Sequence, residues 1–157
     1  MKKDKGWEIT LKFLSLILLG YHLIHLFLLW TDVPGNIVIH FENGEPDNWG
    51  SRYFLLIMPV IGLLIWWLLG KLTKYPEKLN YINLTDENRE IQYKMSCRVL
   101  WIIQNLSFIT FILGNEAFLR YATGDNDNTF FFLSIFSLVF VLLATFYNLI
   151  WAARLKV

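Results

Sequence analysis

The 157-residue chain is strongly apolar: 55% of its residues are hydrophobic, 17% are aromatic, and its mean hydropathy is +0.43. A soluble domain normally carries more charge, so this composition favours a protein in contact with lipid. The formal net charge is only +1, which gives no basis for nucleic-acid binding. Cys97 is the only cysteine, which excludes an internal disulfide and a Cys-rich zinc site.

Four apolar segments are long enough to cross a hydrocarbon layer of about 30 Å, which requires roughly 20 helical residues. They are residues 13–30, 53–70, 99–118 and 130–152. The first run is too long for a removed signal peptide, so we expect it to remain as a span. We therefore predict one all-α integral membrane domain over residues 1–157, with four transmembrane helices.

The basic residues predict how these spans are oriented, because Lys and Arg in short flanking segments are retained in the cytoplasm. One set of flanks holds Lys2, Lys3, Lys5, Lys12, Lys71, Lys74, Lys78, Arg89, Lys94, Arg98, Arg154 and Lys156. The other two loops hold only Arg52 and Arg120. This distribution predicts that both termini are cytoplasmic and that residues 31–52 and 119–129 lie outside.

The segment before the third span carries helix-start signals. Thr85 is a candidate N-cap, and Asp86 and Glu87 would lie in the first turn, where the helix dipole favours acidic residues. Glu90 and Lys94 follow at the i, i+4 spacing of a helical ion pair. We therefore expect one helix over about 86–118, in which a cytoplasmic extension runs directly into the third span.

The outer loop between the first two spans predicts a short strand-like hairpin. Ile37, Ile39 and Phe41 alternate with Val38, His40 and Glu42, a short strand-like pattern. Asn43-Gly44, followed by Pro46-Asp47, supplies turn-forming residues. The loop also contains His40, Glu42, Glu45 and Asp47, which are potential metal ligands. They form no calcium-loop pattern and no nucleophile and base pair, so we expect neither a metal nor a catalytic centre.

Polar residues inside the predicted spans are the second candidate site, because such residues are costly in lipid and often functional. They are His22 and His25 in the first span and Gln104, Asn105, Asn115 and Glu116 in the third. The two histidines share one helix face. They either form a proton or ligand site or hydrogen-bond across helices to a residue such as Asn105, Asn115 or Tyr147. Glu116 either reaches the interface or turns inward to pair with His40 or Arg52.

The stretch VPGNIVIHFENGEPDNWGSR (33–52), followed by an apolar span, resembles a signature of small bacterial membrane proteins. This family is catalogued as a domain of unknown function and includes the SdpI-type immunity protein against the sporulation-delaying toxin. The matching positions are Pro34, Ile37, His40, Phe41, Gly44, Glu45, Asp47, Gly50 and Ser51, with Arg52 where Lys is usual. Val38 and Glu42 depart from the pattern, in which Pro and Asn are common at these positions.

A second segment, YPEKLNYINLTDENREIQY (75–93), is similar to the family's sequence before its third span. The resemblance implies a minimal four-span protein of the bacterial cytoplasmic membrane. It further implies that the residues of the outer motif organise the loop or bind a ligand.

These observations favour a non-enzymatic protein that binds or senses a partner at the outer face, in an immunity-like manner. The expected partners are membrane lipid and an envelope-active peptide, a toxin or another membrane protein, and no cofactor is expected. One alternative is a small transporter, or an accessory subunit of a membrane complex, with the intramembrane polar residues lining a path. A weaker alternative is an enzyme on lipid-linked substrates that uses His40 with Glu45 or Asp47.

Overall fold

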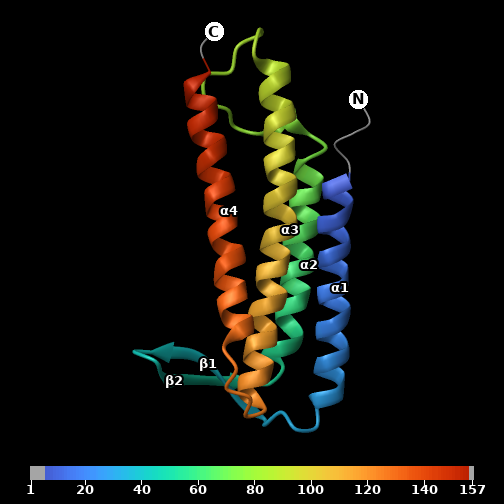
Figure 1. Ribbon diagram of the computed structural model, residues 1–157, viewed down its shortest axis with the longest axis vertical. Helices are drawn as coiled ribbons and strands as arrows, with labels where there is room; N and C mark the ends of the chain where they lie inside the picture. The colour runs from blue at the N-terminus through green and yellow to red at the C-terminus, as the bar shows by residue number, and fades with distance from the viewer. Residues whose placement is uncertain (1–5, 156–157) are drawn as a thin grey trace.

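A computed structural model describes residues 6–155, which form four long helices that run side by side and a hairpin at one end (Figure 1). The helices are α1 (Gly6–Leu29), α2 (Phe54–Leu72), α3 (Arg89–Ala122) and α4 (Thr129–Arg154), with a 3₁₀ turn η1 (Pro76–Lys78). The strands are β1 (Asn36–Glu42) and β2 (Glu45–Ser51). Each long helix is long and apolar enough to cross a membrane, which confirms the predicted spans as candidate membrane helices.

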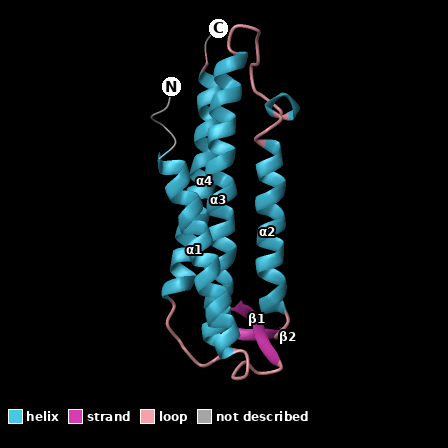
Figure 2. Cartoon of the chain, turned by 90° about the vertical axis from the view of Figure 1, so that its right-hand side faces the viewer, coloured by secondary structure: helices cyan, strands magenta, loops and turns pink. Residues whose placement is uncertain are grey.

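The central helix is α3, which packs against α1, α2 and α4. Figure 2 shows α2 set apart from α4, with α3 between them. Polar residues are buried along α3, whereas the other helices expose Leu, Ile and Phe side chains outward. On α4, Ser134 and Ser137 face α3, and the Ser137 hydroxyl donates to the Leu106 carbonyl at 3.0 Å. Small residues let two apolar helices approach closely, as membrane helices commonly do.

The start of α3 differs from the prediction by one short turn. The helix begins at Arg89 rather than at residue 86, and Asn88 is its N-cap. Thr85 and Asn88 cap one another: the Thr85 N–H donates to the Asn88 side chain and the Asn88 N–H to the Thr85 hydroxyl. These two bonds are those of a capping box, so the predicted capping role of Thr85 is confirmed, and residues 86–88 form the turn that leads into the helix. From Arg89 onward the helix is continuous to Ala122, so the predicted helical extension of the third span is confirmed.

The hairpin closes on the two residues Asn43 and Gly44, whose φ angles are +51° and +85°. Left-handed conformations at both positions are typical of a type I′ turn, for which Asn-Gly is a preferred sequence. The turn predicted at Pro46-Asp47 was wrong, because both residues lie inside β2. Asn-Gly alone completes the reversal, so the residues after it are free to pair with β1.

Apolar packing holds the hairpin against the helix ends. Leu26, Val33, Ile37, Leu55 and Leu119 form one buried cluster from α1, the following loop, β1, α2 and α3. Gly50 is needed for this packing, since an added Cβ would lie 3.0 Å from the Ile39 side chain. The hairpin is therefore a fixed part of the fold.

Arg52, which follows β2, forms hydrogen bonds with the loop that precedes β1. Its N–H donates to the Gly35 carbonyl at 3.0 Å, and its guanidinium donates to the Val33 carbonyl at 3.3 Å. The guanidinium also lies over the Trp30 ring, 4.8 Å from the centroid. Arg52 therefore organises the loop.

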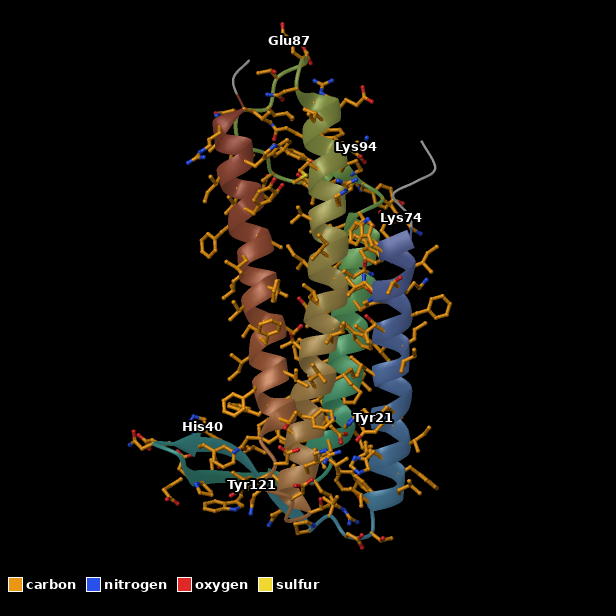
Figure 3. All side chains as sticks on the ribbon, in the orientation of Figure 1. Tyr21, His40, Lys74, Glu87, Lys94 and Tyr121 are labelled. Carbon is orange, nitrogen blue, oxygen red and sulfur yellow. The ribbon has the colours of Figure 1, made fainter. Side chains whose placement is uncertain are left out.

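The two ends of the bundle differ in charge. We call the end at which α1 and α3 begin the basic end; it carries Lys12, Lys71, Lys74, Lys78, Arg89, Lys94, Arg98 and Arg154. We call the opposite end the hairpin end; its Lys and Arg residues, within the described chain, are Arg52 and Arg120. Figure 3 labels Lys74, Glu87 and Lys94 at the basic end and Tyr21, His40 and Tyr121 at the hairpin end. Lys2, Lys3, Lys5 and Lys156 lie outside the described residues.

Candidate functional site

A buried carboxylate lies at the centre of the hairpin end. The Glu116 side chain is 1% exposed and accepts hydrogen bonds at both oxygens. His22 Nδ1 lies 2.8 Å from Oε2, and His25 Nδ1 lies 2.6 Å from Oε1. Arg120 Nε donates to Oε1 at 3.0 Å. A carboxylate surrounded by donors on both oxygens is charge-paired as well as hydrogen-bonded, which is how proteins tolerate a buried charge.

The hydrogen bonds of Asn115 assign the proton of His22. The Asn115 amide nitrogen donates to the Leu55 carbonyl and to His22 Nε2, both at 2.8 Å. His22 Nε2 therefore accepts, and the ring proton lies on Nδ1, where it is donated to Glu116. The His22 ring thus bridges Asn115 and Glu116 through its two nitrogens.

Arg120 extends this cluster toward the surface. Its guanidinium donates to the Tyr21 hydroxyl at 2.8 Å and to Asp125 Oδ2 at 2.8 Å. It also lies over the Phe130 ring, 4.5 Å from the centroid. Tyr21 in turn stacks on His25 and on Phe130.

We call these residues the Glu116 cluster: Tyr21, His22, His25, Asn115, Glu116, Arg120 and Asp125. They come from α1, α3 and the loop after α3, and they contact Leu55 of α2 and Phe130 of α4. The cluster therefore ties the helices together directly beside the hairpin. Removing Glu116 would leave buried donors unpaired, which commonly costs several kcal/mol.

The structure separates the predicted intramembrane residues into two groups. Gln104 and Asn105 lie nearer the basic end, where Gln104 donates to the Trp66 carbonyl at 2.7 Å. Asn105 Oδ1 accepts from Trp66 Nε1 at 3.2 Å and from the Ser15 hydroxyl at 3.4 Å. Apolar residues of α3 that include Phe108, Ile109 and Ile112 lie between this pair and Glu116 in sequence and are buried.

Several predicted partners were wrong. Glu116 pairs with His22, His25 and Arg120, not with His40 or Arg52. Of the partners predicted for the histidine pair, Asn115 is confirmed by its bond to His22. Asn105 bonds with Ser15 and Trp66 in the other group, and the Tyr147 side chain is 58% exposed. Tyr21 and Asp125 were missed, whereas Arg120 could have been found, because it follows Glu116 by four residues on one helix face.

The polar residues of the outer motif mostly hold the hairpin itself. His40 Nδ1 lies 2.5 Å from Asp47 Oδ1, across the two strands, and the His40 side chain is 63% exposed. The Ser51 hydroxyl accepts from the Tyr53 N–H at 3.4 Å. Pro34 is exposed in the loop before β1. Within the described residues, no cluster of three or more His, Cys, Asp or Glu side chains is arranged to hold a metal ion.

Two carboxylates face one another at the tip of the hairpin. Glu42 and Glu45 are a directly paired position of β1 and β2, and both are exposed. Neither has an ion pair with another described residue. Like charges placed opposite one another destabilise a strand pair, so this tip provides negative charge without internal compensation.

An open groove runs beside this tip. It has a volume of about 490 Å³ and is bounded by the hairpin, the end of α3, the loop after it and the start of α4. Its lining comprises Phe41, Gly44, Tyr121, Asn126, Asn128, Phe131 and Phe132. Phe41 and Tyr121 meet edge to face with ring centroids 5.1 Å apart, which joins the hairpin to α3. We call this the aromatic groove.

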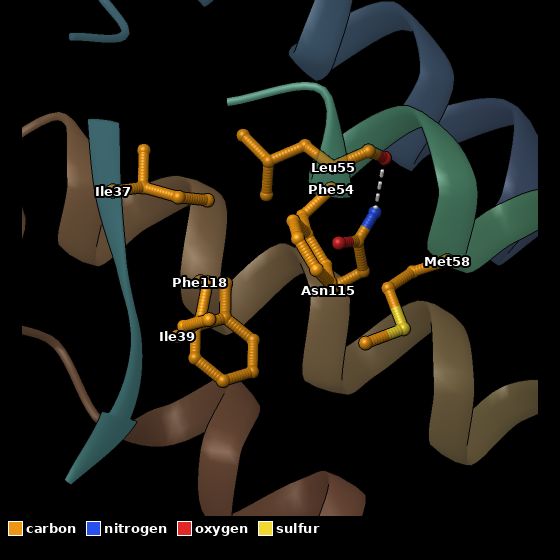
Figure 4. A pocket seen from close by; sticks show the side chains of 7 residues that line it. All are labelled: Ile37, Ile39, Phe54, Leu55, Met58, Asn115 and Phe118. Carbon is orange, nitrogen blue, oxygen red and sulfur yellow. Dashed lines mark hydrogen bonds between the residues drawn. The ribbon is translucent and has the colours of Figure 1, made fainter. Parts of the chain in front are cut away.

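A smaller cavity of about 110 Å³ lies behind the hairpin (Figure 4). Its lining is apolar, from residues of β1, α2 and α3, except for Asn115. The Asn115 amide nitrogen is used by Leu55 and His22, whereas its buried oxygen Oδ1 has no partner in the described chain. This unpaired acceptor was not predicted from the sequence.

The fold and the site together define a helical protein with four candidate membrane spans in its described residues and a structured hairpin beside a buried ion cluster. Residues 16–63 match a family described as a domain of unknown function, DUF1648. The matched segment covers most of α1, the whole hairpin and the first half of α2. No curated protein and no solved structure matches the chain.

Proposed function

We propose that this protein is a multi-pass protein of the bacterial cytoplasmic membrane that binds a cationic amphipathic peptide at its outer, hairpin end. The binding is non-enzymatic and gives the protein a sensing or immunity-like role. The observation that carries the proposal is the aromatic groove beside the unpaired carboxylates Glu42 and Glu45.

The aromatic groove suits the apolar face of such a peptide. Tyr121, Phe131 and Phe132 provide large rings, and aromatic side chains dominate the binding energy of interfaces. Asn126 and Asn128 add amide groups that can hydrogen-bond a peptide backbone. The groove lies where a membrane-spanning helix ends, so one face of a ligand can contact lipid while the other contacts water.

The charge of the hairpin end favours a cationic ligand. The loops at this end carry six acidic side chains, all exposed: Asp32, Glu42, Glu45, Asp47, Asp125 and Asp127. Arg52 and Arg120 are the basic residues there, and both are engaged inside the fold. Complementary charge raises the association rate and selects the partner, so a peptide rich in lysine is the expected ligand.

The proposed orientation rests on the positive-inside rule. The basic end of the described chain holds the large majority of its Lys and Arg residues, so it would face the cytoplasm. The hairpin end would then face the outside, where envelope-active peptides are met. Immunity in the SdpI manner would follow if the bound peptide were kept out of the lipid.

The separation of the polar residues gives the transporter alternative little support. Asn115 lines the cavity behind the hairpin, whereas Gln104 and Asn105 line a different cavity at the basic end. The enzyme alternative would use His40, which is instead paired with Asp47 on an exposed surface. The structure offers fewer observations in support of these two alternatives than in support of peptide binding.

Binding can be measured with the purified protein in phosphatidylcholine nanodiscs and a fluorescent peptide of alternating Lys and Leu, followed by anisotropy. We expect the double variant Glu42→Gln/Glu45→Gln to weaken binding about three- to tenfold, because two favourable ion pairs are lost. The matched control is Glu77→Gln/Glu90→Gln, which removes two exposed carboxylates at the basic end. Phe131→Ala, with Phe146→Ala as control, tests the aromatic contribution on the same helix.

Binding that is equal for the hairpin and basic-end double variants would contradict the proposal. So would equal affinity for a peptide in which Glu replaces every Lys. In cells, a clean deletion that leaves sensitivity to cationic membrane-active peptides unchanged would remove the proposed immunity-like role.

A further inference from the structure

A cavity of about 420 Å³ opens at the basic end, between α1, α2 and α3. Its volume lies within the range of small-molecule sites, about 300–1,000 Å³. Three lysines from different parts of the fold line it: Lys12 of α1, Lys71 of α2 and Lys74 of the loop that follows α2. This cavity plays no part in the peptide-binding proposal.

Among the described residues, the lysines around this cavity have no carboxylate partner. No carboxylate belongs to its lining, and none of the three has an ion pair with another described residue. Two of the three contact tryptophan rings: Lys71 Nζ lies 3.6 Å from the centre of the Trp67 ring, and Lys12 Nζ lies 5.9 Å from that of Trp66. The positive-inside rule accounts for lysines at this end, but it does not require them to surround one cavity.

The wall of the cavity is a built polar surface. Gln104 donates to the Trp66 carbonyl, and the Trp66 ring nitrogen donates to Asn105, so the indole between them is fixed. Gly70 leaves room for this approach, because an added Cβ would lie 2.6 Å from Gln104 Nε2 and the amide would have to shift. Gln104 and Asn105 are buried, at 5% and 1% exposed. They therefore hold the Trp66 ring in place, and Lys12 lies over this ring.

We infer that this cavity binds the phosphate headgroup of an anionic phospholipid. Three ammonium groups supply the positive charge that a phosphate needs, and tryptophans favour the headgroup level of a membrane. Basic pockets between membrane helices are a recurrent form of headgroup site. The acyl chains of the lipid would lie along the exposed apolar side chains of the helices, and Leu68 of α2 is one such side chain.

The test is lipid selectivity. The protein is purified from membranes containing equal amounts of phosphatidylglycerol and phosphatidylcholine, and the retained lipids are counted by native mass spectrometry. The wild-type protein should retain phosphatidylglycerol preferentially. The triple variant Lys12→Gln/Lys71→Gln/Lys74→Gln should lower this preference about tenfold, since each lysine near an anionic lipid adds several-fold to binding.

The matched control is Lys78→Gln/Arg89→Gln/Lys94→Gln, which removes equal charge at the same end outside the cavity lining. This control should keep the preference for phosphatidylglycerol. An equal loss in both triple variants, or no preference in the wild type, would overturn the inference. If the cavity variant does not fold, Lys71→Gln is compared with Lys78→Gln by the rise in melting temperature on adding phosphatidylglycerol, with loss in the former expected.

A soluble arm distinguishes the source of the phosphate. Glycerol 3-phosphate is titrated against the protein in phosphatidylcholine nanodiscs while tryptophan fluorescence is recorded. A lipid site predicts weak or undetectable binding of the soluble compound beside clear selectivity for the lipid. Tight binding of glycerol 3-phosphate without lipid selectivity would overturn the lipid assignment and identify a soluble phosphate ester as the ligand.

Discussion

The hairpin end and the basic end differ in how their charged side chains are paired. At the hairpin end, Glu116 is neutralised within the protein by donors from α1 and α3. At the basic end, Lys12, Lys71 and Lys74 lie around a cavity without carboxylates. In the first arrangement both oxygens of the buried carboxylate have partners, whereas in the second no described carboxylate lines the cavity beside the lysines. Buried polar residues here organise the fold, while the surface charges without a described partner are those on which both ligand proposals rest.

The largest effect should come from removing the central carboxylate. Glu116→Ala leaves Arg120 and His22 without their acceptor in a buried place, so we expect a loss of about 3–5 kcal/mol in unfolding free energy. Unfolding in mixed detergent micelles measures it. Glu90→Ala, an exposed carboxylate on the same helix, is the control and should change stability by less than about 0.5 kcal/mol. A Glu116→Ala protein as stable as this control would contradict the structural role of the cluster.

The three histidines should rank by burial. His22 is fully buried and bonded at both nitrogens, so His22→Ala should cost about 2–4 kcal/mol. His25 is 24% exposed with one such bond, and we expect a loss of about 1–2 kcal/mol. His40 lies on the hairpin surface, so His40→Ala should change the unfolding free energy by less than about 0.5 kcal/mol. The same unfolding assay measures all three, and a reversed order would contradict the ranking by burial and hydrogen bonding.

A glycine substitution probes the polar wall at the basic end. Gly70→Ala displaces the Gln104 amide, and losing its bond to the Trp66 carbonyl would cost about 1 kcal/mol, which offsets the gain in helix propensity. Gly20→Ala meets no atom within 4 Å and should stabilise its helix by up to about 1 kcal/mol. Melting temperatures should therefore place Gly70→Ala below Gly20→Ala. Equal values would show that the Gln104 contact contributes nothing.

The smallest effect concerns the loop before α4. Hydrogen bonds from the Thr129 hydroxyl and N–H hold the pKa of Asp127 below its usual value of 3.8. A lowered pKa in the folded state stabilises the fold above the unfolded pKa, and this contribution is lost as the pH falls through the folded value. Asp127→Ala should slightly lower the melting temperature at pH 7, with a smaller difference at about pH 3. A difference that grows on acidification would contradict this linkage.

Helices were the part of the fold that sequence could predict, because long apolar runs have few other stable forms in lipid. The hairpin followed from alternation and Asn-Gly, although Pro46-Asp47 gave a false turn signal. The Thr85 cap was predicted correctly, whereas the regular helix begins at Arg89, three residues later than predicted, because residues 86–88 form a turn that follows Thr85.

The site was less predictable, since hydropathy identifies polar residues but not their partners. His22 and Glu116 are separated by 94 positions, and their meeting depends on how α1 packs on α3. Likewise, the convergence of Lys12 with Lys71 and Lys74 could not be found along the chain. Asn115 Oδ1 has no sequence signal at all, because only the positions of Leu55 and His22 show that one end of its amide is used.

The proposal that the two ends face opposite sides of the membrane is tested most directly by cysteine labelling on intact cells. Cys97→Ser removes the native thiol, and single cysteines are placed at exposed Asn126 of the hairpin end or Glu87 of the basic end. A membrane-impermeant maleimide should label Asn126→Cys on intact cells and Glu87→Cys only after permeabilisation. Labelling of Glu87→Cys on intact cells, with Asn126→Cys protected, would contradict the outward-facing peptide site.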